Sequence, residues 1–203
     1  SLNANLSVGG EAARLAWRLT GFARTIDDLI VDDYSRPGFP DGIYVNVDRK
    51  VRSRGVEGQA TVQIADGISA RGSFALTRTR AEGAGRQFDR IPKAQAKATV
   101  SYDSPEHPFG ASASLLWTGD VHQQVTGFGR VNYGDYTVVD LAAYAYVDGD
   151  ARRHRLTARL ENAFDEDYAT RVNSALIDLS TQRFLFKFRG APRTLHVSYA
   201  YSF

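Results

Sequence analysis

The sequence contains no cysteine, no methionine and no run of about 18 apolar residues. The absence of cysteine excludes a disulfide scaffold and thiolate chemistry with metals or redox partners. The absence of a long apolar run excludes a transmembrane helix. Because the initiator methionine is missing and the residues from Ser1 onward already alternate like a strand, we expect the gene product to begin upstream of this chain.

A dominant charge of one sign is also missing. The chain has 25 Lys and Arg against 23 Asp and Glu, and these residues are spread along it without forming a block, so nucleic acid is not an expected partner. The four histidines, His107, His122, His154 and His196, lack a metal-ligand spacing such as His-x-x-x-His. No Ser/His/Asp set stands on recognisable catalytic elements. We therefore expect no enzyme activity, no cofactor and no resident metal.

Apolar and polar residues alternate without a slip through the last ten residues, 194–203. A period of two predicts an extended strand with one apolar face and one face of small or polar residues. Aromatic residues crowd the end of the apolar face, as in the interfacial girdle of a membrane barrel. A strand of a soluble sandwich is the alternative that this segment leaves open. The apolar face consists of Leu195, Val197, Tyr199, Tyr201 and Phe203.

The same alternation predicts nine strands in all. In the seventh strand, Val138, Tyr144 and Tyr146 fall on the same face as Asp140, so the pattern does not assign its faces. Part of 181–189, where phenylalanines alternate with other residues, is expected to extend the last strand above a Gly-Ala-Pro kink. The nine segments are 1–8, 13–31, 43–64, 68–77, 93–102, 111–118, 136–147, 155–164 and 194–203.

Short turns and long loops alternate strictly between these strands, so all short connections lie at one end of the sheet. This layout is typical of outer-membrane barrels. The polar faces carry Arg, Lys, Gln and Glu in mid-strand, which a wet lumen can solvate and a packed interior cannot. The pattern favours an all-β, antiparallel up-and-down transmembrane barrel. The short turns are predicted at Gly9-Gly10, Asp66-Gly67, 103–108 and 148–150, and the long loops at 32–42, 80–91, 119–135 and 165–180.

Several motifs occur in order along the chain: 19–30, Tyr44-Val45-Asn46 followed by Gly55-Val56-Glu57, Arg90-Ile91-Pro92-Lys93, residues 161–168, and Gly190-Ala191-Pro192-Arg193 through to Phe203. Their order and spacing resemble the TonB-dependent outer-membrane receptors of Gram-negative bacteria. The most specific match is 161–168, Glu-Asn-Ala-Phe-Asp-Glu-Asp-Tyr, close to the family's Glu-Asn-Leu-Phe-Asp-x-x-Tyr. The resemblance covers nearly the whole chain.

The resemblance implies a 22-stranded barrel filled by an N-terminal plug domain, which contacts the energy-coupling TonB protein of the inner membrane. Since bacterial single-chain barrels close with even strand numbers, nine strands indicate the C-terminal part of a larger barrel. Residues 1–203 would form that part, with the plug domain and the first strands absent. The implied location is the cell outer membrane.

The implied function is energy-coupled uptake of a scarce solute too large for porins. A ferric siderophore is the expected solute, with cobalamin, haem or an oligosaccharide as other options. Two further interpretations stay open, a passive porin-like channel and a soluble all-β binding module. The expected partners are the solute, TonB through the absent plug, the barrel-assembly machinery and outer-membrane lipid.

The long loops contain aromatic and cationic residues of the kind that bind a ferric chelate. The last strand resembles the signal read by the barrel-assembly machinery, and a simple aromatic girdle is its alternative. The candidate substrate-binding residues are Tyr34, Arg36, Tyr44, His122, Tyr133, Tyr136 and Arg171, and the candidate assembly signal is Tyr199, Tyr201 and Phe203.

Other charged residues allow two interpretations each. The acidic run 165–167 could bind a cation or be solvated. The basic run 152–155 could meet lipid phosphates at the periplasmic lip or form a plain solvated turn. His196 is expected to face the lumen. Arginines expected to face the lumen could attract an anionic substrate or hydrogen-bond a plug or one another; they are Arg18, Arg24, Arg71 and Arg159.

Overall fold

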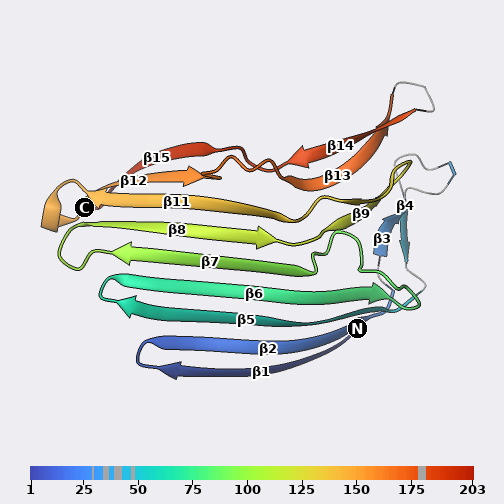
Figure 1. Cartoon of the computed structure of the whole chain (residues 1–203), viewed down its shortest axis with the longest axis horizontal. Coiled ribbons are helices and arrows are strands. Elements are labelled where there is room, and N and C mark those ends of the chain that lie inside the picture. The colour runs from blue at the N-terminus through green and yellow to red at the C-terminus, as the bar shows by residue number, and fades with distance from the viewer. Residues whose placement is uncertain (29, 34–36, 39–42, 47–48, 178–181) are drawn as a thin grey trace.

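The computed structural model describes residues 1–28, 30–33, 37–38, 43–46, 49–177 and 182–203, and its main feature is a nine-stranded antiparallel sheet (Figure 1). Among these residues, no helix is long and apolar enough to cross a membrane. β1 and β15 are the edges of the sheet. In spatial order the strands are β1 (Leu2–Ala12), β2 (Leu15–Ile26), β5 (Val51–Ala65), β6 (Ile68–Ala81), β7 (Ala94–Asp103), β8 (Phe109–Thr118), β11 (Tyr136–Tyr146), β12 (His154–Glu161) and β15 (Thr194–Tyr201).

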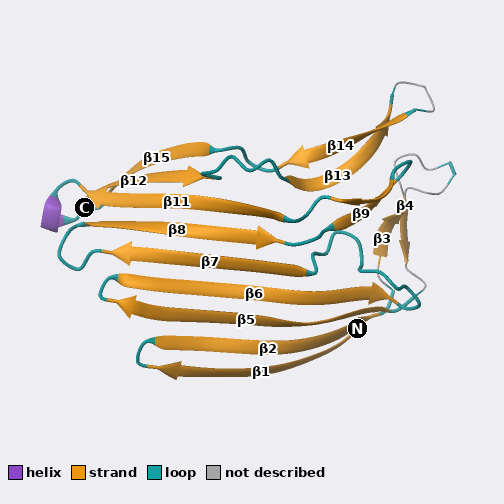
Figure 2. Ribbon diagram, in the orientation of Figure 1, coloured by secondary structure: helices purple, strands orange, loops and turns teal. Residues whose placement is uncertain are grey.

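The two ends of the sheet differ, as predicted from the alternation of turns and loops. Short turns lie at one end, together with the 3₁₀ helix η1 (Gly149–Ala151), and long connections lie at the other, which we call the loop end (Figure 2). Three of these long connections contain short hairpins that the sequence pattern did not indicate. They are β3 (Ile30–Asp33) with β4 (Ile43–Asn46), β9 (His122–Val125) with β10 (Gly129–Asn132), and β13 (Ala169–Leu176) with β14 (Arg183–Arg189).

The hairpins correct three of the predicted boundaries. The strand predicted at 13–31 divides into β2 and β3, and the strand predicted at 43–64 divides into β4 and β5. The predicted extension at 181–189 is formed by β14, but β14 pairs with β13 in a separate two-stranded sheet. The long connections form hairpins of their own because backbone groups that leave the main sheet need other hydrogen-bond partners.

The register of the sheet brings apolar residues opposite one another from strand to strand. Val56 lies opposite Leu76, Ala98 opposite Leu115, and Leu141 opposite Leu160. Since Leu141 belongs to this apolar face, the neighbouring Asp140 belongs to the polar face, which resolves the ambiguous strand β11. Such cross-strand pairs stabilise each face of the sheet and fix its register.

The apolar face has no second layer of protein against it in the described part of the chain. Leu6 is 81% exposed and Leu195 is 64% exposed. The buried apolar side chains, Val51, Val121, Val125, Ala169 and Val172, instead all lie at the loop end. A soluble sandwich buries one face of each sheet in a common core, whereas a barrel strand turns its apolar face to lipid. The uncovered apolar face therefore argues against the interpretation of this chain as a self-contained soluble all-β module.

The predicted turn at Gly9-Gly10 is wrong. Both glycines lie inside β1, and the chain turns at residues 13–14. A Cβ atom on Gly9 would stand 2.7 Å from the carbonyl oxygen of Trp17, and one on Gly10 would stand 3.0 Å from its Nε1 atom. The two glycines therefore leave room for Trp17 on the neighbouring strand, and turn geometry is not their role.

The arginines expected in the lumen lie on the polar face with His196. Arg159 donates to Asp140 Oδ2 at 3.0 Å and lies 3.2 Å from Glu161 Oε1. Glu161 in turn lies 3.4 Å from His196 Nε2. Arg24 donates from Nε to an asparagine on β1 at 2.7 Å. The partners of Arg24 and Arg159 are side chains of the same or neighbouring strands, and the expected contacts with a plug or between arginines stay untested.

Candidate ligand-binding site at the loop end

Three of the candidate substrate-binding residues come together at the loop end. Tyr133 follows β10, Tyr136 begins β11, and Arg171 lies in β13. Burial raises the pKa of Tyr133, and the nearby guanidinium groups of Arg90 and Arg171 act in the opposite direction. The cluster therefore places two cations beside one half-buried phenol.

Two more aromatic rings border this cluster. The Tyr136 ring stacks on the Tyr168 ring, with centroids 4.6 Å apart. The guanidinium carbon of Arg171 lies 5.8 Å from the centre of the Phe188 ring, within the range of a cation–π contact. We call Arg90, Tyr133, Tyr136, Tyr168 and Arg171 the ring–cation cluster.

The other candidates do not join this cluster. Tyr34 and Arg36 lie outside the described residues. Tyr44 stands exposed on the separate hairpin β3–β4. His122 begins β9, and its backbone carbonyl oxygen accepts a hydrogen bond from the Arg90 N–H at 2.8 Å. The His122 backbone thus holds the connection that carries Arg90.

Asn162, from the motif 161–168, fastens the base of the loop that carries β13 and β14. Its side chain is buried, and its Nδ2 donates to the carbonyl oxygens of Glu166 at 2.9 Å and Ala191 at 3.0 Å. Its Oδ1 accepts the Glu166 N–H at 2.9 Å. The backbone N–H of Asn162 donates to Asp140 Oδ1 at 3.0 Å. Asparagine suits this position because its backbone φ is +48°, a left-handed value that asparagine tolerates.

The terminal motif meets the same loop at two further points. Asp165 Oδ1 accepts the Arg193 N–H at 3.0 Å. Gly190 donates to the Tyr168 carbonyl at 2.9 Å, and a Cβ atom on Gly190 would overlap the Tyr168 ring. Glycine at this position leaves the space that the Tyr168 ring occupies while it stacks on Tyr136. The two motifs are therefore joined in space to hold part of the ring–cation cluster.

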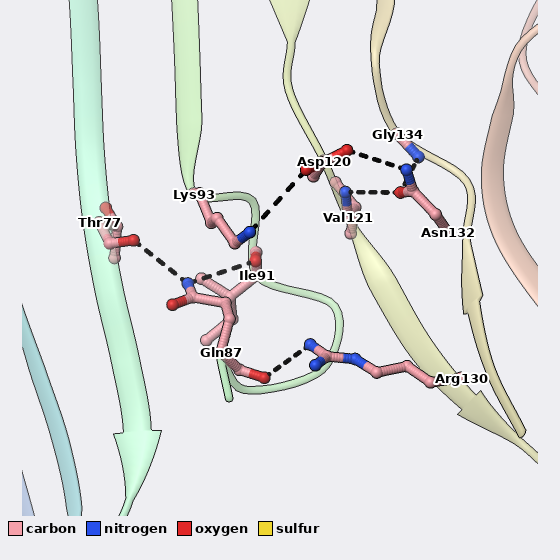
Figure 3. A network of polar contacts seen from close by, with 9 residues as sticks. All are labelled: Thr77, Gln87, Ile91, Lys93, Asp120, Val121, Arg130, Asn132 and Gly134. Carbon is pink, nitrogen blue, oxygen red and sulfur yellow. Dashed lines mark hydrogen bonds and ion pairs between the residues drawn. The ribbon is translucent and has the colours of Figure 1, made fainter. Parts of the chain in front are cut away.

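The connection 82–93 is fastened to β6 and to the hairpin β9–β10 (Figure 3). The buried side chain of Gln87 accepts the Thr79 N–H at 3.0 Å and donates to the Thr77 carbonyl at 3.2 Å. These groups lie on β6 beyond the last residue that pairs with β7, so Gln87 replaces the missing strand partner. Arg130 donates to the Gln87 carbonyl at 2.8 Å and links β10 to the same connection.

A second group of polar contacts in Figure 3 closes the base of the hairpin β9–β10. Asn132 donates to Asp120 Oδ1 at 2.9 Å and accepts the N–H groups of Val121 and Gly134, each at 3.2 Å. Lys93 approaches Asp120 Oδ2 at 3.8 Å. The connections around Arg90 and Tyr133 are therefore held by internal hydrogen bonds and ion pairs.

The acidic run is engaged with the protein itself. Asp167 pairs with Arg189 at 2.6 Å, and Asp165 accepts the Arg193 N–H. Within the described ranges, no group of three or more His, Cys, Asp or Glu side chains is arranged to hold a metal ion. These contacts give the carboxylates of Asp165 and Asp167 a structural role.

At the opposite end, the terminal aromatics lie exposed on the apolar face. Tyr199 OH is 2.6 Å from His154 Nδ1, and the Tyr201 ring lies 4.8 Å from the His154 ring. Phe203 lies beyond the end of β15 and is fully exposed. Arg155, from the basic run, has its guanidinium carbon 4.1 Å from the centre of the Tyr144 ring.

Sequence reasoning missed several residues that build the site. Tyr168 and Phe188 were visible as the end of a motif and as part of an alternating run, but nothing in either pattern indicates that they meet Tyr136 and Arg171. Gln87 gave no signal, because a glutamine in a polar loop has no distinctive pattern. Its role follows only from the edge of β6 that it covers.

Comparison with known proteins identifies the family. The model of the family "TonB dependent receptor-like, beta-barrel" matches residues 1–163. The vitamin B12 transporter BtuB of Photobacterium profundum is 29% identical over 177 residues, which are 84% of this chain and 27% of that protein. This chain therefore spans less than a third of the length of this curated relative.

Solved structures share the fold. The pyoverdine receptor FpvA of Pseudomonas aeruginosa PAO1 is 21% identical with a TM-score of 0.74, over 99% of this chain and 30% of that one. The ferric yersiniabactin uptake receptor FyuA of Yersinia pestis is 16% identical with a TM-score of 0.76, over 99% and 29%. The copper transporter OprC is 17% identical with a TM-score of 0.76, over 99% and 32%. With its nine-stranded sheet and the match of the family model over most of its length, this chain belongs to the TonB-dependent receptor family of β-barrels.

Proposed function

We propose that this chain is the C-terminal part of an outer-membrane receptor that imports a scarce solute with energy supplied through TonB. The uncovered apolar face, continuous across nine strands and backed by a polar face, carries this proposal. Such a wall is stable with lipid on one side and water on the other. In this proposal the plug domain and the first strands of the receptor lie outside this chain.

In this mechanism the barrel wall supplies a wide, wet conduit and the loop end supplies the ligand contacts. Arg159, one of the arginines on the polar face, is already paired with Asp140 and Glu161, so it holds neighbouring strands together and is not free to bind substrate. TonB moves the plug, and the solute then passes along the polar face.

A ferric siderophore is the solute that we propose. The ring–cation cluster offers Arg90 and Arg171 beside three tyrosines, which suits a bulky anionic chelate. The fold is shared with receptors described as binding pyoverdine and taking up ferric yersiniabactin. These likenesses support the fold of such a receptor, and the cluster supports the ligand.

Cobalamin is the second candidate. The relative described as a vitamin B12 transporter is 29% identical to this chain, whereas FpvA and FyuA are 21% and 16% identical. One uptake assay distinguishes the two candidate solutes, because each labelled solute can be supplied alone.

The test is uptake by a Gram-negative host that lacks its own receptors and produces the intact receptor to which this chain belongs. We expect accumulation of radiolabelled ferric siderophore that stops when TonB is deleted. Accumulation of labelled cobalamin alone would show that the solute is cobalamin and that the proposed ferric siderophore is wrong. Uptake that persists without TonB would support the porin-like alternative and overturn energy coupling.

A further inference from the structure

Strand β14 carries a ladder of three phenylalanines that the ring–cation cluster does not include. Phe184, Phe186 and Phe188 share one face, with neighbouring ring centroids 5.8 Å and 5.3 Å apart. Phe184 is 44% exposed and Phe188 is 46% exposed. An exposed apolar strip of this kind on a polar protein surface indicates a contact surface.

The ladder lies beyond the part of the barrel that crosses the hydrocarbon. A barrel strand spans that layer with about 9 to 11 residues. β11 alone has 11 residues, and the hairpin β13–β14 projects past the loop end of this strand (Figure 1). A lipid girdle therefore does not account for the three rings.

The register of the hairpin turns the ladder towards the ring–cation cluster. Phe188 lies directly opposite Arg171 across the hairpin, so the two side chains share a face. Arg171 is close enough to Tyr133 to act on its phenol. The ladder is thus a continuation of the cluster along β14.

The opposite face of the hairpin fixes this orientation. Val172 is fully buried there, next to Lys187 in the register. Ser174 Oγ donates to the Thr126 carbonyl at 2.8 Å, which ties the hairpin to the connection between β9 and β10. The Phe face is therefore free to meet a ligand while the other face is anchored.

Ring faces next to an unneutralised guanidinium suit a flat, anionic aromatic group. Among the described residues Arg171 forms no ion pair, so its charge is available to a ligand. An aromatic ring of the ligand stacks on the phenylalanines, and its negative oxygens face Arg171. A hydroxamate has no ring to stack, and a corrinoid offers no anionic aromatic oxygens.

We infer that Phe184, Phe186, Phe188 and Arg171 form a docking face for the aromatic iron-binding groups of a catecholate or phenolate chelate. This inference rests on the proposed uptake function and specifies its ligand. It assigns ligand specificity to β14, a strand that contains none of the substrate-binding residues predicted from the sequence.

The test measures binding by the intact, detergent-solubilised receptor with three probes: a ferric tris-catecholate, a ferric trihydroxamate and cyanocobalamin. Phe188→Leu and Phe186→Leu keep apolar volume and remove the ring. We expect each to weaken tris-catecholate binding about two- to tenfold and to leave the other two affinities unchanged. Arg171→Gln should weaken tris-catecholate binding about tenfold and reduce its salt dependence.

Phe109→Leu is the matched control, because Phe109 is 42% exposed and lies at the opposite end of the sheet. Heat-modifiable migration of every variant verifies that the barrel is folded. Equal losses for all three probes, or no loss for the tris-catecholate, would overturn the docking face. Binding of cyanocobalamin alone by the unmodified receptor would overturn the ligand class and leave the uptake proposal intact. Failure of the folded receptor to take up any solute would instead overturn the proposed function.

Discussion

Gly190 shows how one residue without a side chain positions an aromatic ring. Its missing Cβ atom leaves the space in which the Tyr168 ring lies, and Tyr168 stacks on Tyr136. The family motif that contains Gly190 is therefore explained by contact with a second motif, 161–168, about 25 residues earlier in the chain.

We expect Gly190→Ala to displace Tyr168, because the added carbon would overlap its ring. The receptor should lose heat resistance, at a cost of about 1–3 kcal/mol typical of overpacking. The midpoint of heat-modifiable migration measures this loss. Gly85→Ala is the control, since a Cβ atom there meets nothing within 4 Å, and equal midpoints for the two variants would contradict the explanation.

Asp148 makes the turn before β12 sensitive to acid. Desolvation alone would raise the pKa of its carboxyl, but the backbone N–H groups of Arg153 and His154 donate to it and lower that pKa below its ordinary 3.8. A lowered pKa means that the turn gains stability above pH 3.8 and loses it as pH falls through the lower folded value.

We expect the amide protons of Arg153 and His154 to lose hydrogen-exchange protection as the pH falls below 3.8 towards the lower folded pKa of Asp148, after correction for intrinsic rates. Asp148→Asn keeps an acceptor and removes the titration, so the protection of these two amides should no longer depend on pH. A pH dependence that survives in Asp148→Asn would assign the effect to another group.

At the scale of the element, alternation is enough to predict the nine strands of the main sheet. Each long strand has one apolar face and one polar face, so its sequence carries the period of two. The hairpin strands carry an incomplete signal: β9 reads His-Gln-Gln-Val and is only four residues long, and the alternation in β14 indicates a strand but not its pairing with β13. Residue type pointed to Tyr133, Tyr136 and Arg171 but not to Arg90 or Tyr168, and the five residues of the ring–cation cluster meet only because of where these hairpins and connections lie.

The connection 82–93 depends on Gln87 for its attachment to β6. Gln87→Leu would leave the N–H of Thr79 and the carbonyl of Thr77 without this partner, at about 1–3 kcal/mol for each group. We expect faster trypsin cleavage after Arg86 and Arg90 in folded receptor. Gln95→Leu, at an exposed position in β7, is the control and should cleave at the original rate.

At the scale of the whole molecule, the exposed C-terminal end of β15 allows strand pairing to be tested separately from recognition by the barrel-assembly machinery. Phe203 lies beyond the ladder of hydrogen bonds between β12 and β15. Deleting Phe203 should therefore leave strand pairing unchanged and reduce the amount of heat-modifiable barrel in the outer membrane, with synthesis unaffected. Phe203→Tyr keeps an aromatic ring and should assemble normally. Undiminished barrel after the deletion would remove Phe203 from the assembly signal.

The concentration of buried apolar side chains at the loop end has a consequence for how heat disrupts the molecule. The strands have little internal packing to lose, so the surrounding acyl chains must set their melting temperature. That temperature should follow acyl length in a series of saturated phosphatidylcholine vesicles and peak where bilayer thickness matches the apolar band. The hairpins, which have their own small core of valines, should melt at a temperature that is indifferent to the lipid.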